Sequence, residues 1–500
     1  MVWAIPNGDA VTLGEIGGEL YSVTPRDELH LGDEFVRRGG AVIPPARVTG
    51  LKQRRPFGQQ ESLTEQDGDD EDDDRHAPHA LQLLRKSARF VRHFFVDDEQ
   101  MIARTLVDAA AWAVRAAIIR PMGEDTEDAS AFISKDDATR IAKKTESIAA
   151  MAWHPTVSLL AVAQRDGVVA FYDIATGSWD GRVLEHNAQQ EITGVAWAKH
   201  SGGVLAVSCR LNEAVGGPVV MSPKNRQQEP ELVQVLTHPT KKAFYQVSWS
   251  EDGTQLAAFA DDTSSVFVFD AHFQRLAELK CYQRVTSIRW SPTGEYLFVS
   301  TASNVSLMWE TLTWKKEVWD LATASSAWSS NGRCLLVAPR KGSQLYPYEF
   351  RAVPPTISVC MNSPPVGFSE KEVFSLDKSI AEYDLSPELR KNELIPSDWD
   401  GRQVGGKVET IAWDPTSTRI AVTYRSSTTD TADVGSLVAI FAVAWSPFLI
   451  ITRSGLIRGP PHAGVPRHVT FASSFEKGAL LSIAWSSGII SFHPFYYDQE

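Results

Sequence analysis

Hydrophobic and polar positions alternate with a period of two through short stretches of the chain. Residues 148–174 read IAAMAWHPTVSLLAVAQRDGVVAFYDI, and the segments IAAMAW, LLAVAQ and VVAFYDI each alternate as half-buried strands do. Pro155 ends the first segment, because proline cannot donate to a strand ladder. Asp166 and Gly167 match a tight hairpin turn, whose central residues need positive φ. The stretch predicts a three-stranded meander that cannot bury both of its faces alone.

Similar stretches recur along the chain, each with an aromatic landmark just before its first turn. The landmarks are Trp153, Trp197, Trp249, Trp290, Trp328, Trp413 and Phe471. Most of their spacings lie near 40 to 60 residues, the range of a four-stranded propeller blade. An open β-sandwich with chance tryptophans is the alternative, but radial repetition explains all the copies and leaves few exposed strand edges. The sequence therefore predicts an all-β fold, a seven-bladed WD40-type β-propeller over residues 146–497.

Two regions interrupt or precede this repeat. The gap of 85 residues between Trp328 and Trp413 predicts a long insertion in blade five, at about 354–407. The final copy supplies only three strands, HVTFAS, ALLSIAW and IISFHPF, before the chain stops. Residues 1–25 alternate around Gly17 and Gly18. We expect them to form a hairpin, over 11–23, that closes the last blade by donating its outermost strand.

Residues 26–77 are polar and contain seven acidic residues between Asp67 and Asp74. Such a block repels itself and stays solvated, so we expect a flexible acidic linker. Binding of calcium or of histone-like partners is the alternative, but the run lacks the spaced ligands of an EF-hand loop. Residues 78–145 change to the period of amphipathic helices, with a basic outer face. This N-terminal helical insertion either packs against the propeller, which we favour, or lies on a membrane surface.

Composition excludes several classes of protein. The formal net charge of −13 argues against general binding to nucleic-acid phosphates. No apolar stretch reaches the roughly 18 residues of a transmembrane helix, so we expect no membrane span in this chain. The four cysteines form no CxxC pair, which favours a reducing, intracellular setting.

The search for catalytic motifs gives one decoy. Residues 401–407, GRQVGGK, fit the phosphate-binding pattern GxxxxGK, but Val408 follows where magnesium binding needs Ser or Thr. The stretch also precedes a strand, whereas a phosphate cradle opens a helix. We interpret His154 and His493 as loop histidines, because neither has metal-ligand spacing to other donors. We expect no enzyme activity, no catalytic residue, no cofactor and no metal. Protein binding through the loop-bearing faces remains, with unknown contact residues.

Several strings resemble one family, the Aladin family of WD-repeat nucleoporins. They are SFEKGALLSIAWSSGI at 474–489, NVSLMWETLTWKKEVW at 304–319, MAWHP at 151–155 and LVQVLTHP at 232–239. The resemblance covers about 150–497 well and 78–145 more loosely. Ala472 and Ser473 stand where the family pattern has His-Pro, and the acidic block is not a family feature.

The resemblance implies a non-enzymatic scaffold subunit of the nuclear pore complex. Family members are held at the nuclear envelope by a transmembrane nucleoporin and are linked to nucleocytoplasmic protein transport. The resemblance implies protein partners and no direct nucleic acid. The alternative is a WD-repeat adaptor of another complex, such as a ubiquitin ligase or a signalling assembly.

Overall fold

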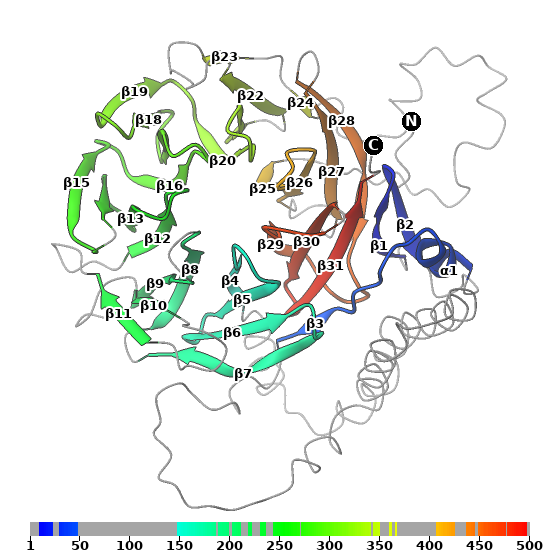
Figure 1. Ribbon diagram of the computed structural model, residues 1–500. Helices are drawn as coiled ribbons and strands as arrows, with labels where there is room; N and C mark the ends of the chain where they lie inside the picture. Colours follow the sequence, from blue (N-terminus) through cyan, green and yellow to red (C-terminus); the bar gives the residue numbers. More distant parts are fainter. Residues whose placement is uncertain are drawn as a thin grey trace, which may run out of the picture.

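Seven β-sheets are arranged as blades around a central axis (Figure 1). This confirms the all-β, seven-bladed propeller predicted from the repeats. The computed structural model describes residues 10–23, 30–48, 148–186, 189–199, 203–211, 219–222, 231–236, 244–270, 272–341, 344–350, 360–362, 366–367, 407–425, 437–445, 449–476 and 478–497.

Blades one to four each contain four antiparallel strands that follow the chain from the centre outwards. Blade one consists of β4 (Ile148–Trp153), β5 (Leu159–Gln164), β6 (Val168–Asp173) and β7 (Ser178–Glu185). Blade two consists of β8 (Gln190–Trp197), β9 (Leu205–Leu211), β10 (Val219–Ser222) and β11 (Glu231–Val235). Blade three consists of β12 (Phe244–Trp249), β13 (Leu256–Ala260), β14 (Ser265–Phe269) and β15 (Arg275–Lys280). Blade four consists of β16 (Val285–Trp290), β17 (Tyr296–Thr301), β18 (Ser306–Glu310) and β19 (Lys315–Trp319).

Blades five and seven depart from this plan at their outer strands, whereas blade six follows it. Blade five consists of β20 (Thr323–Trp328), β21 (Cys334–Pro339), β22 (Gln344–Phe350) and β23 (Cys360–Asn362), and β24 (Val366–Gly367) also pairs with β22. Blade six consists of β25 (Val408–Trp413), β26 (Arg419–Tyr424), β27 (Leu437–Ala444) and β28 (Ile450–Arg458). Blade seven has β29 (Pro466–Phe471), β30 (Gly478–Trp485) and β31 (Ile489–Tyr496). The insertion expected at 354–407 contains β23 and β24, and residues 368–406 lie outside the described ranges.

The aromatic landmarks lie at the ends of the innermost strands. All seven side chains are buried. Some of them also join neighbouring blades: the indole Nε1 of Trp197 donates to the carbonyl of Ala152, and that of Trp290 to the carbonyl of Ser248, at 3.1 and 2.9 Å. The repeat seen in the sequence thus marks the joints between blades.

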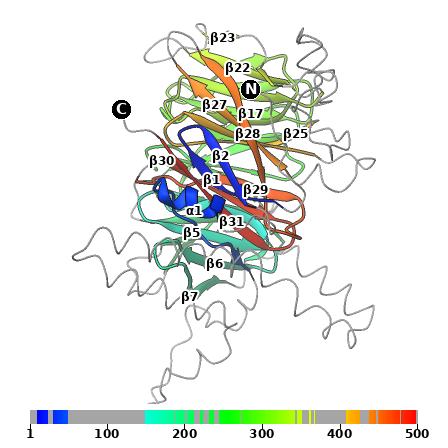
Figure 2. The same ribbon diagram turned by 90° about the vertical axis from the view of Figure 1, so that its right-hand side faces the viewer.

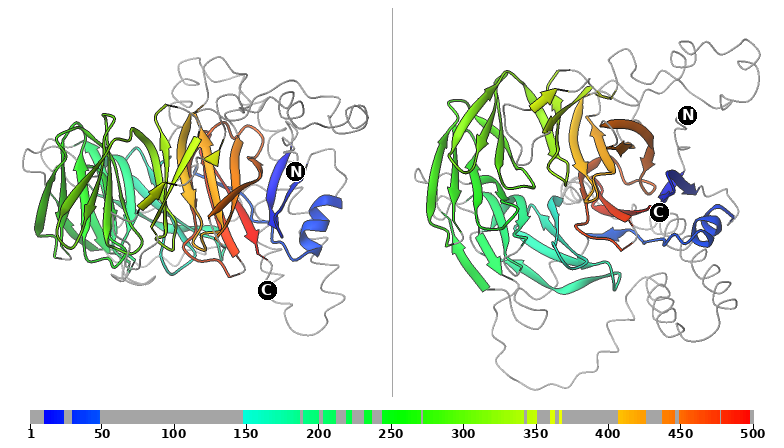
Figure 3. Two further views of the ribbon diagram at one scale, coloured as in Figure 1. Left: turned by 90° about the horizontal axis from the view of Figure 1, so that it is seen from above. Right: turned by 45° about the horizontal axis from the view of Figure 1, so that its top comes forward.

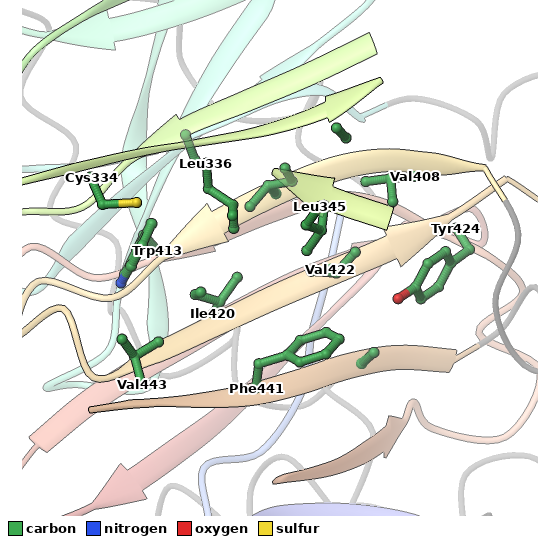
Figure 4. Close-up of a cluster of buried hydrophobic side chains, with 14 of the residues drawn as sticks. Cys334, Leu336, Leu345, Val408, Trp413, Ile420, Val422, Tyr424, Phe441 and Val443 are labelled. Atoms are coloured by element: carbon green, nitrogen blue, oxygen red, sulfur yellow. The ribbon is translucent and has the colours of Figure 1, made fainter. Parts of the chain in front are cut away.

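The apolar cores lie between adjacent blades. In the cluster between blades five and six, Leu336 and Leu345 face Val422 and Phe441 (Figure 4). Because a neighbouring blade covers each side, the middle strands are buried on both faces. The strand LLAVAQ (β5) was expected to be half-buried, but it is buried along almost its whole length. Small alanine side chains at its alternate positions allow this close stacking.

Blade seven is completed by two separate N-terminal strands. Strand β1 (Val11–Ile16) forms a hairpin with β2 (Glu19–Val23) and pairs in parallel with β31 at Glu15 and Ile16. Strand β3 (Ala46–Arg47) pairs antiparallel with the other end of β31. Figure 2 shows β1 and β2 against blade seven. The fourth strand position is therefore shared, whereas the sequence argument gave it to residues 11–23 alone.

The first part of the expected linker is structured, which corrects its boundary. Residues 30–48 contain helix α1 (His30–Arg37) and β3. Phe35 of α1 is fully buried and packs with Leu13, Tyr21 and Val23 of the hairpin. Burial of the Phe35 side chain against the hairpin therefore holds α1 in place, although residues 30–48 are mostly polar. The acidic block at 67–74 and the helical segment at 78–145 lie outside the described residues.

The hairpin approaches its neighbours closely on both sides. A Cβ atom at Gly14 would lie 2.4 Å from the carbonyl oxygen of Pro494 in β31. On the blade-six side, a Cβ atom at Gly455 would lie 2.3 Å from Leu20 Cδ1. In addition, the backbone N–H of Arg458 donates to Thr12 Oγ1 at 3.1 Å. The hairpin is therefore wedged between β31 and β28, and it contacts two blades.

A buried ion pair crosses this contact. Glu15 of β1 has no solvent exposure, and Arg419 of β26 donates to its Oε1 from Nε at 2.8 Å and from Nη2 at 2.5 Å. Ser454 of β28 donates to the other carboxylate oxygen at 3.3 Å. Burial lowers the pKa of Arg419, but the hydrogen bonds and charge of Glu15 outweigh this and raise it overall. The pair is satisfied only while the hairpin is in place.

A buried histidine lies on the strand that the hairpin covers. His493 of β31 is 1% exposed, and its Nε2 shares a hydrogen bond with Ser491 Oγ at 2.8 Å. Burial lowers the pKa of His493 from 6.5 to about 4. The imidazole of His493 is therefore neutral in the folded propeller near pH 7.

Replacing Glu15 by Ala is expected to lower the free energy of unfolding by about 3 to 5 kcal/mol, because it leaves the Arg419 charge without its buried partner. Denaturant titration measures the change. Glu19→Ala in the same hairpin is the matched control. Its exposed ion pair with Arg38, at 3.7 Å, should contribute less than about 1 kcal/mol. Equal losses for the two variants would contradict the closure role of Glu15.

Acid is expected to destabilise the fold between pH 6.5 and pH 4 through His493. In this window the unfolded chain binds a proton that the folded chain does not, so stability falls as the pH falls, by up to about 3 kcal/mol. His493→Gln should flatten this part of the stability profile, and the exposed His272→Gln should not. An unchanged slope in His493→Gln would show that other groups carry the acid sensitivity.

Candidate functional site: the two faces of the propeller

The described side chains form no cluster of metal-binding donors. No group of three or more His, Cys, Asp or Glu residues within the described ranges could hold a metal ion. The thiols of Cys209, Cys281 and Cys334 are buried, and burial raises the pKa of Cys281 to about 12. Within the described part of the chain, no helix has the length and apolar character needed to span a bilayer.

The two histidines singled out from the sequence have structural contacts. His154 lies in the first turn of blade one, where its Nδ1 accepts the backbone N–H groups of Thr156 and Val157 at 3.2 Å. His493 does not lie in a loop, as the sequence analysis expected, but in the buried strand β31. Pro494, which follows it, is accommodated in the strand because β1 runs alongside with Gly14 at that point.

The strands define two faces of the ring, which Figure 3 (left) shows edge-on. Every innermost strand begins at one face, named here the start face, and ends with its landmark at the other, the end face. The end face carries the turns between first and second strands and between third and fourth strands. The start face carries the remaining turns and the connections between blades.

The end-face turns use their polar groups internally. After the landmarks of blades three, four, five and six, a Ser or Asp side chain accepts the backbone N–H five residues later, from Gln255, Tyr296, Cys334 and Arg419. The distances are 2.7–3.0 Å. These turns are therefore rigid, and their hydroxyl and carboxylate groups are already engaged.

Each innermost strand has a bulge near the start face. The register shifts after Ile148, Ile192, Phe244, Val285, Thr323, Val408 and Pro466. The bulge residues stand between neighbouring inner strands: Thr193 donates from Oγ1 to the carbonyl of Tyr245 at 2.6 Å. Because bulges recur at one height in all seven blades, they shape the start-face mouth of the ring.

Arginines recur at equivalent positions on the start face. The residues that pair with Ile148, Ile192, Thr323 and Val408 are each followed in the chain by an arginine. These arginines are Arg165, Arg210, Arg340 and Arg425. A local sequence signal exists for them, since each lies 12 or 13 residues after its landmark tryptophan. The sequence analysis did not use this spacing.

The two faces of the blades differ in charge. Among the described residues, the basic side chains of the start face are Arg47, Arg165, Arg210, Lys280, Arg284, Arg340, Lys341, Lys407, Arg425 and Arg467. The acidic ones are Asp166, Glu185, Glu191, Asp261, Asp262, Asp320 and Glu409. Acidic side chains of the end face are Asp173, Glu251, Asp252, Asp270, Glu295, Glu310, Glu349, Asp414 and Glu476, and its basic ones are Lys199, Arg275, Lys315, Arg333 and Arg419. Within the described part of the chain, the start face is thus the more positive of the two, although the whole chain is acidic.

The outer edge of blade four exposes apolar side chains. Leu312 is 89% exposed, Tyr282 76% and Val318 58%. The ammonium group of Lys316 lies 4.2 Å from the centroid of the Tyr282 ring, a cation–π contact. Lysines at this edge strand, β19, discourage pairing with the strand of another chain.

Comparison with known proteins assigns the repeat to a family. The model of the Aladin seven-bladed propeller matches residues 133–496. Aladin from Arabidopsis thaliana is 24% identical over 337 residues, which covers 63% of this chain and 68% of that protein.

Solved structures with a similar fold are more distant in sequence. The β-propeller domain of Cps50 (Swd1) from Myceliophteria thermophila is 13% identical with a TM-score of 0.44, covering 69% of this chain and 96% of that one. A chain of the Mitotic Checkpoint Complex is 14% identical with a TM-score of 0.48, covering 70% and 91%. The family model, in contrast, covers well over half of the chain with all of its blades, and on this ground the protein belongs to the Aladin seven-bladed propeller family.

Proposed function

We propose that this protein is a non-enzymatic scaffold subunit of the nuclear pore complex. It binds other nucleoporins through its propeller surfaces, is held at the nuclear envelope by a transmembrane nucleoporin, and supports nucleocytoplasmic protein transport. The observation that carries the proposal is the match of residues 133–496 to the Aladin propeller family. The relative from Arabidopsis thaliana bears the same family name.

The geometry suits a scaffold, because the binding surfaces are preformed. The turns of the end face are fixed by internal hydrogen bonds, and the blade joints are fixed by buried aromatics. A rigid partner loses little conformational entropy on assembly, so more of the contact energy remains as affinity. Two faces of different charge and an outer edge give the ring several separate contact surfaces.

The experiment is localisation of the protein in its own cells, with a fluorescent tag joined through a flexible linker after Glu500. We expect a punctate nuclear rim, and loss of the rim signal to a diffuse pool when the transmembrane nucleoporin of the pore membrane is depleted. The rim-to-nucleoplasm ratio should then fall to that of the tag alone.

Two controls make this result specific. Protein abundance, measured by immunoblot after the depletion, must be unchanged, so that lost rim signal reflects lost anchoring. The destabilised Glu15→Ala variant shows how misfolding affects the signal. Diffuse signal in untreated cells, with proximity labelling of ubiquitin-ligase or signalling subunits in place of nucleoporins, would contradict the proposal and favour a WD-repeat adaptor.

A further inference from the structure

One charged side chain stands among the small ones that surround the ring axis. Arg289 directly precedes the landmark Trp290 in β16. The equivalent positions of the other blades hold only small side chains, which are Ala152, Ala196, Ser248, Ala327, Ala412 and Thr470. All of these except Ala327 are half-exposed. Because the innermost strands face the axis (Figure 1), solvent reaches these positions through a central channel, and Arg289 is the charged group at this level of it.

The Arg289 side chain is exposed and desolvated at the same time. It is accessible to solvent, yet the protein around it removes enough water to lower the pKa of the guanidinium. Both statements hold together for a side chain that borders a channel, where a little water is enclosed by protein. Walls of low dielectric constant strengthen the attraction between such a charge and an anion.

Arg289 has no carboxylate partner among the described residues. Burial is the one cause that acts on its pKa, whereas at Arg419 the hydrogen bonds and the charge of Glu15 outweigh burial. A charge that the protein has partly removed from water is normally compensated by an opposite charge. The described part of the chain supplies that compensation for Arg419 and does not supply it for Arg289.

A single hydrogen bond orients the guanidinium and leaves most of its donors unused. The Nε of Arg289 donates to the carbonyl of Ser326 in β20 at 3.3 Å, across the joint between blades four and five. The Nη1 and Nη2 groups form no hydrogen bond with any described residue. These two nitrogens make up the fork that matches two oxygens of an oxyanion.

Hydroxyl groups lie beside the guanidinium. Ser287 comes two residues before Arg289 in β16, so both side chains are on the same face of the strand. The Ser287 side chain is half-exposed and has no hydrogen bond to any described residue. The hydroxyls of Ser300, which pairs with Ser287, and of Ser326 are buried and also unpartnered within the described ranges. This joint therefore surrounds a positive charge with neutral hydroxyls.

We propose that Arg289 and Ser287 form a binding site for a phosphate group in the central channel, at the joint between blades four and five. The Nη1 and Nη2 groups of Arg289 donate to two of its oxygens, and the Ser287 hydroxyl donates to a third. A phosphate group has oxygens for both the fork and the hydroxyl, whereas a carboxylate has only two oxygens in all. The bound group supplies the counter-charge of Arg289. The proposal does not depend on the nuclear pore assignment.

Isothermal titration calorimetry of the full chain with inorganic phosphate, at constant pH and ionic strength, tests the site. We expect saturable binding at one site. Arg289→Gln should weaken the binding at least about tenfold, because a charge-assisted pair of hydrogen bonds is lost. The amide of the new side chain can still donate to the Ser326 carbonyl, which preserves the joint. Ser287→Ala should weaken the binding about threefold.

The matched control is Arg275→Gln, which removes an exposed arginine from the outer strand β15. Phosphate binding by this variant should equal that of the unaltered protein. Melting curves recorded without phosphate show whether each variant is folded. Absence of saturable binding to the unaltered chain, or equal binding by Arg289→Gln and Arg275→Gln, would overturn the proposal.

Two further ligands define the chemistry and its source. Acetate at the same ionic strength should bind at least about tenfold more weakly than phosphate, and equal affinity would overturn the choice of a phosphate group. Glycerol 2-phosphate separates a phosphate group on an organic molecule from the free ion. Binding as tight as that of inorganic phosphate, and equally dependent on Arg289, assigns the site to a phosphate ester. Preference for inorganic phosphate assigns it to the free ion.

Protection from phenylglyoxal, a reagent that modifies arginine side chains, tests the site in the unaltered protein. Peptide mass spectrometry measures the modification of Arg289 and Arg275 with and without inorganic phosphate. Phosphate is expected to suppress the modification of Arg289 and to leave that of Arg275 unchanged. This measurement decides the question even if Arg289→Gln fails to fold. Equal modification of Arg289 in the presence and absence of phosphate would contradict the proposal.

Discussion

Ring closure depends on the N-terminal hairpin and on β3, which both pair with β31, because the described residues after Val465 give blade seven three strands. A propeller buries its apolar surface between blades, so every blade needs a neighbour on both sides. Strand β1 continues the sheet of blade seven, while Glu15, Thr12 and Leu20 reach across to blade six. The hairpin therefore supplies backbone partners to one blade and side-chain contacts to the next.

The contact between the hairpin and blade six depends on the buried ion pair of Glu15 and Arg419. Burying either Glu15 or Arg419 alone would cost desolvation free energy, whereas in the pair each charge offsets the other. The pair therefore favours this position of the hairpin over any shifted register. A one-residue slip of β1 would turn Glu15 away from Arg419 and Leu13 away from Phe35. We infer that the pair contributes mainly to the specificity of closure, with Phe35 and the apolar hairpin side chains supplying the driving force.

The blades could be predicted from the sequence because the pattern of each blade lies within one short stretch of the chain. Each copy holds its own alternation, turn and landmark, so Trp153 through Phe471 could be placed without a structure. The closing hairpin at 11–23 was also predicted from its local alternation, but β3 and α1 left no such pattern. Strand β3 has only two residues, and helix α1 is recognisable only through Phe35, whose pocket comes from other parts of the chain.

The surface was less predictable than the core for the same reason. Arg165 and Arg425 each follow a landmark by the same spacing, but the sequence alone does not show that both lie on the start face of the ring. His493 was interpreted as a loop histidine although the predicted strand IISFHPF contains it. The strand β1, which covers it with Gly14 against Pro494, lies at the opposite end of the sequence.

Hydrogen exchange on strand β31 tests the closure most directly. The unaltered protein is compared with a chain lacking residues 1–25 and with a control lacking residues 50–77. Closure by the hairpin predicts that loss of residues 1–25 speeds exchange of the amides of Ile489–Tyr496, whereas the control retains its protection. Equal protection of β31 in all three proteins would contradict the account, because β31 would then be held in place without the hairpin.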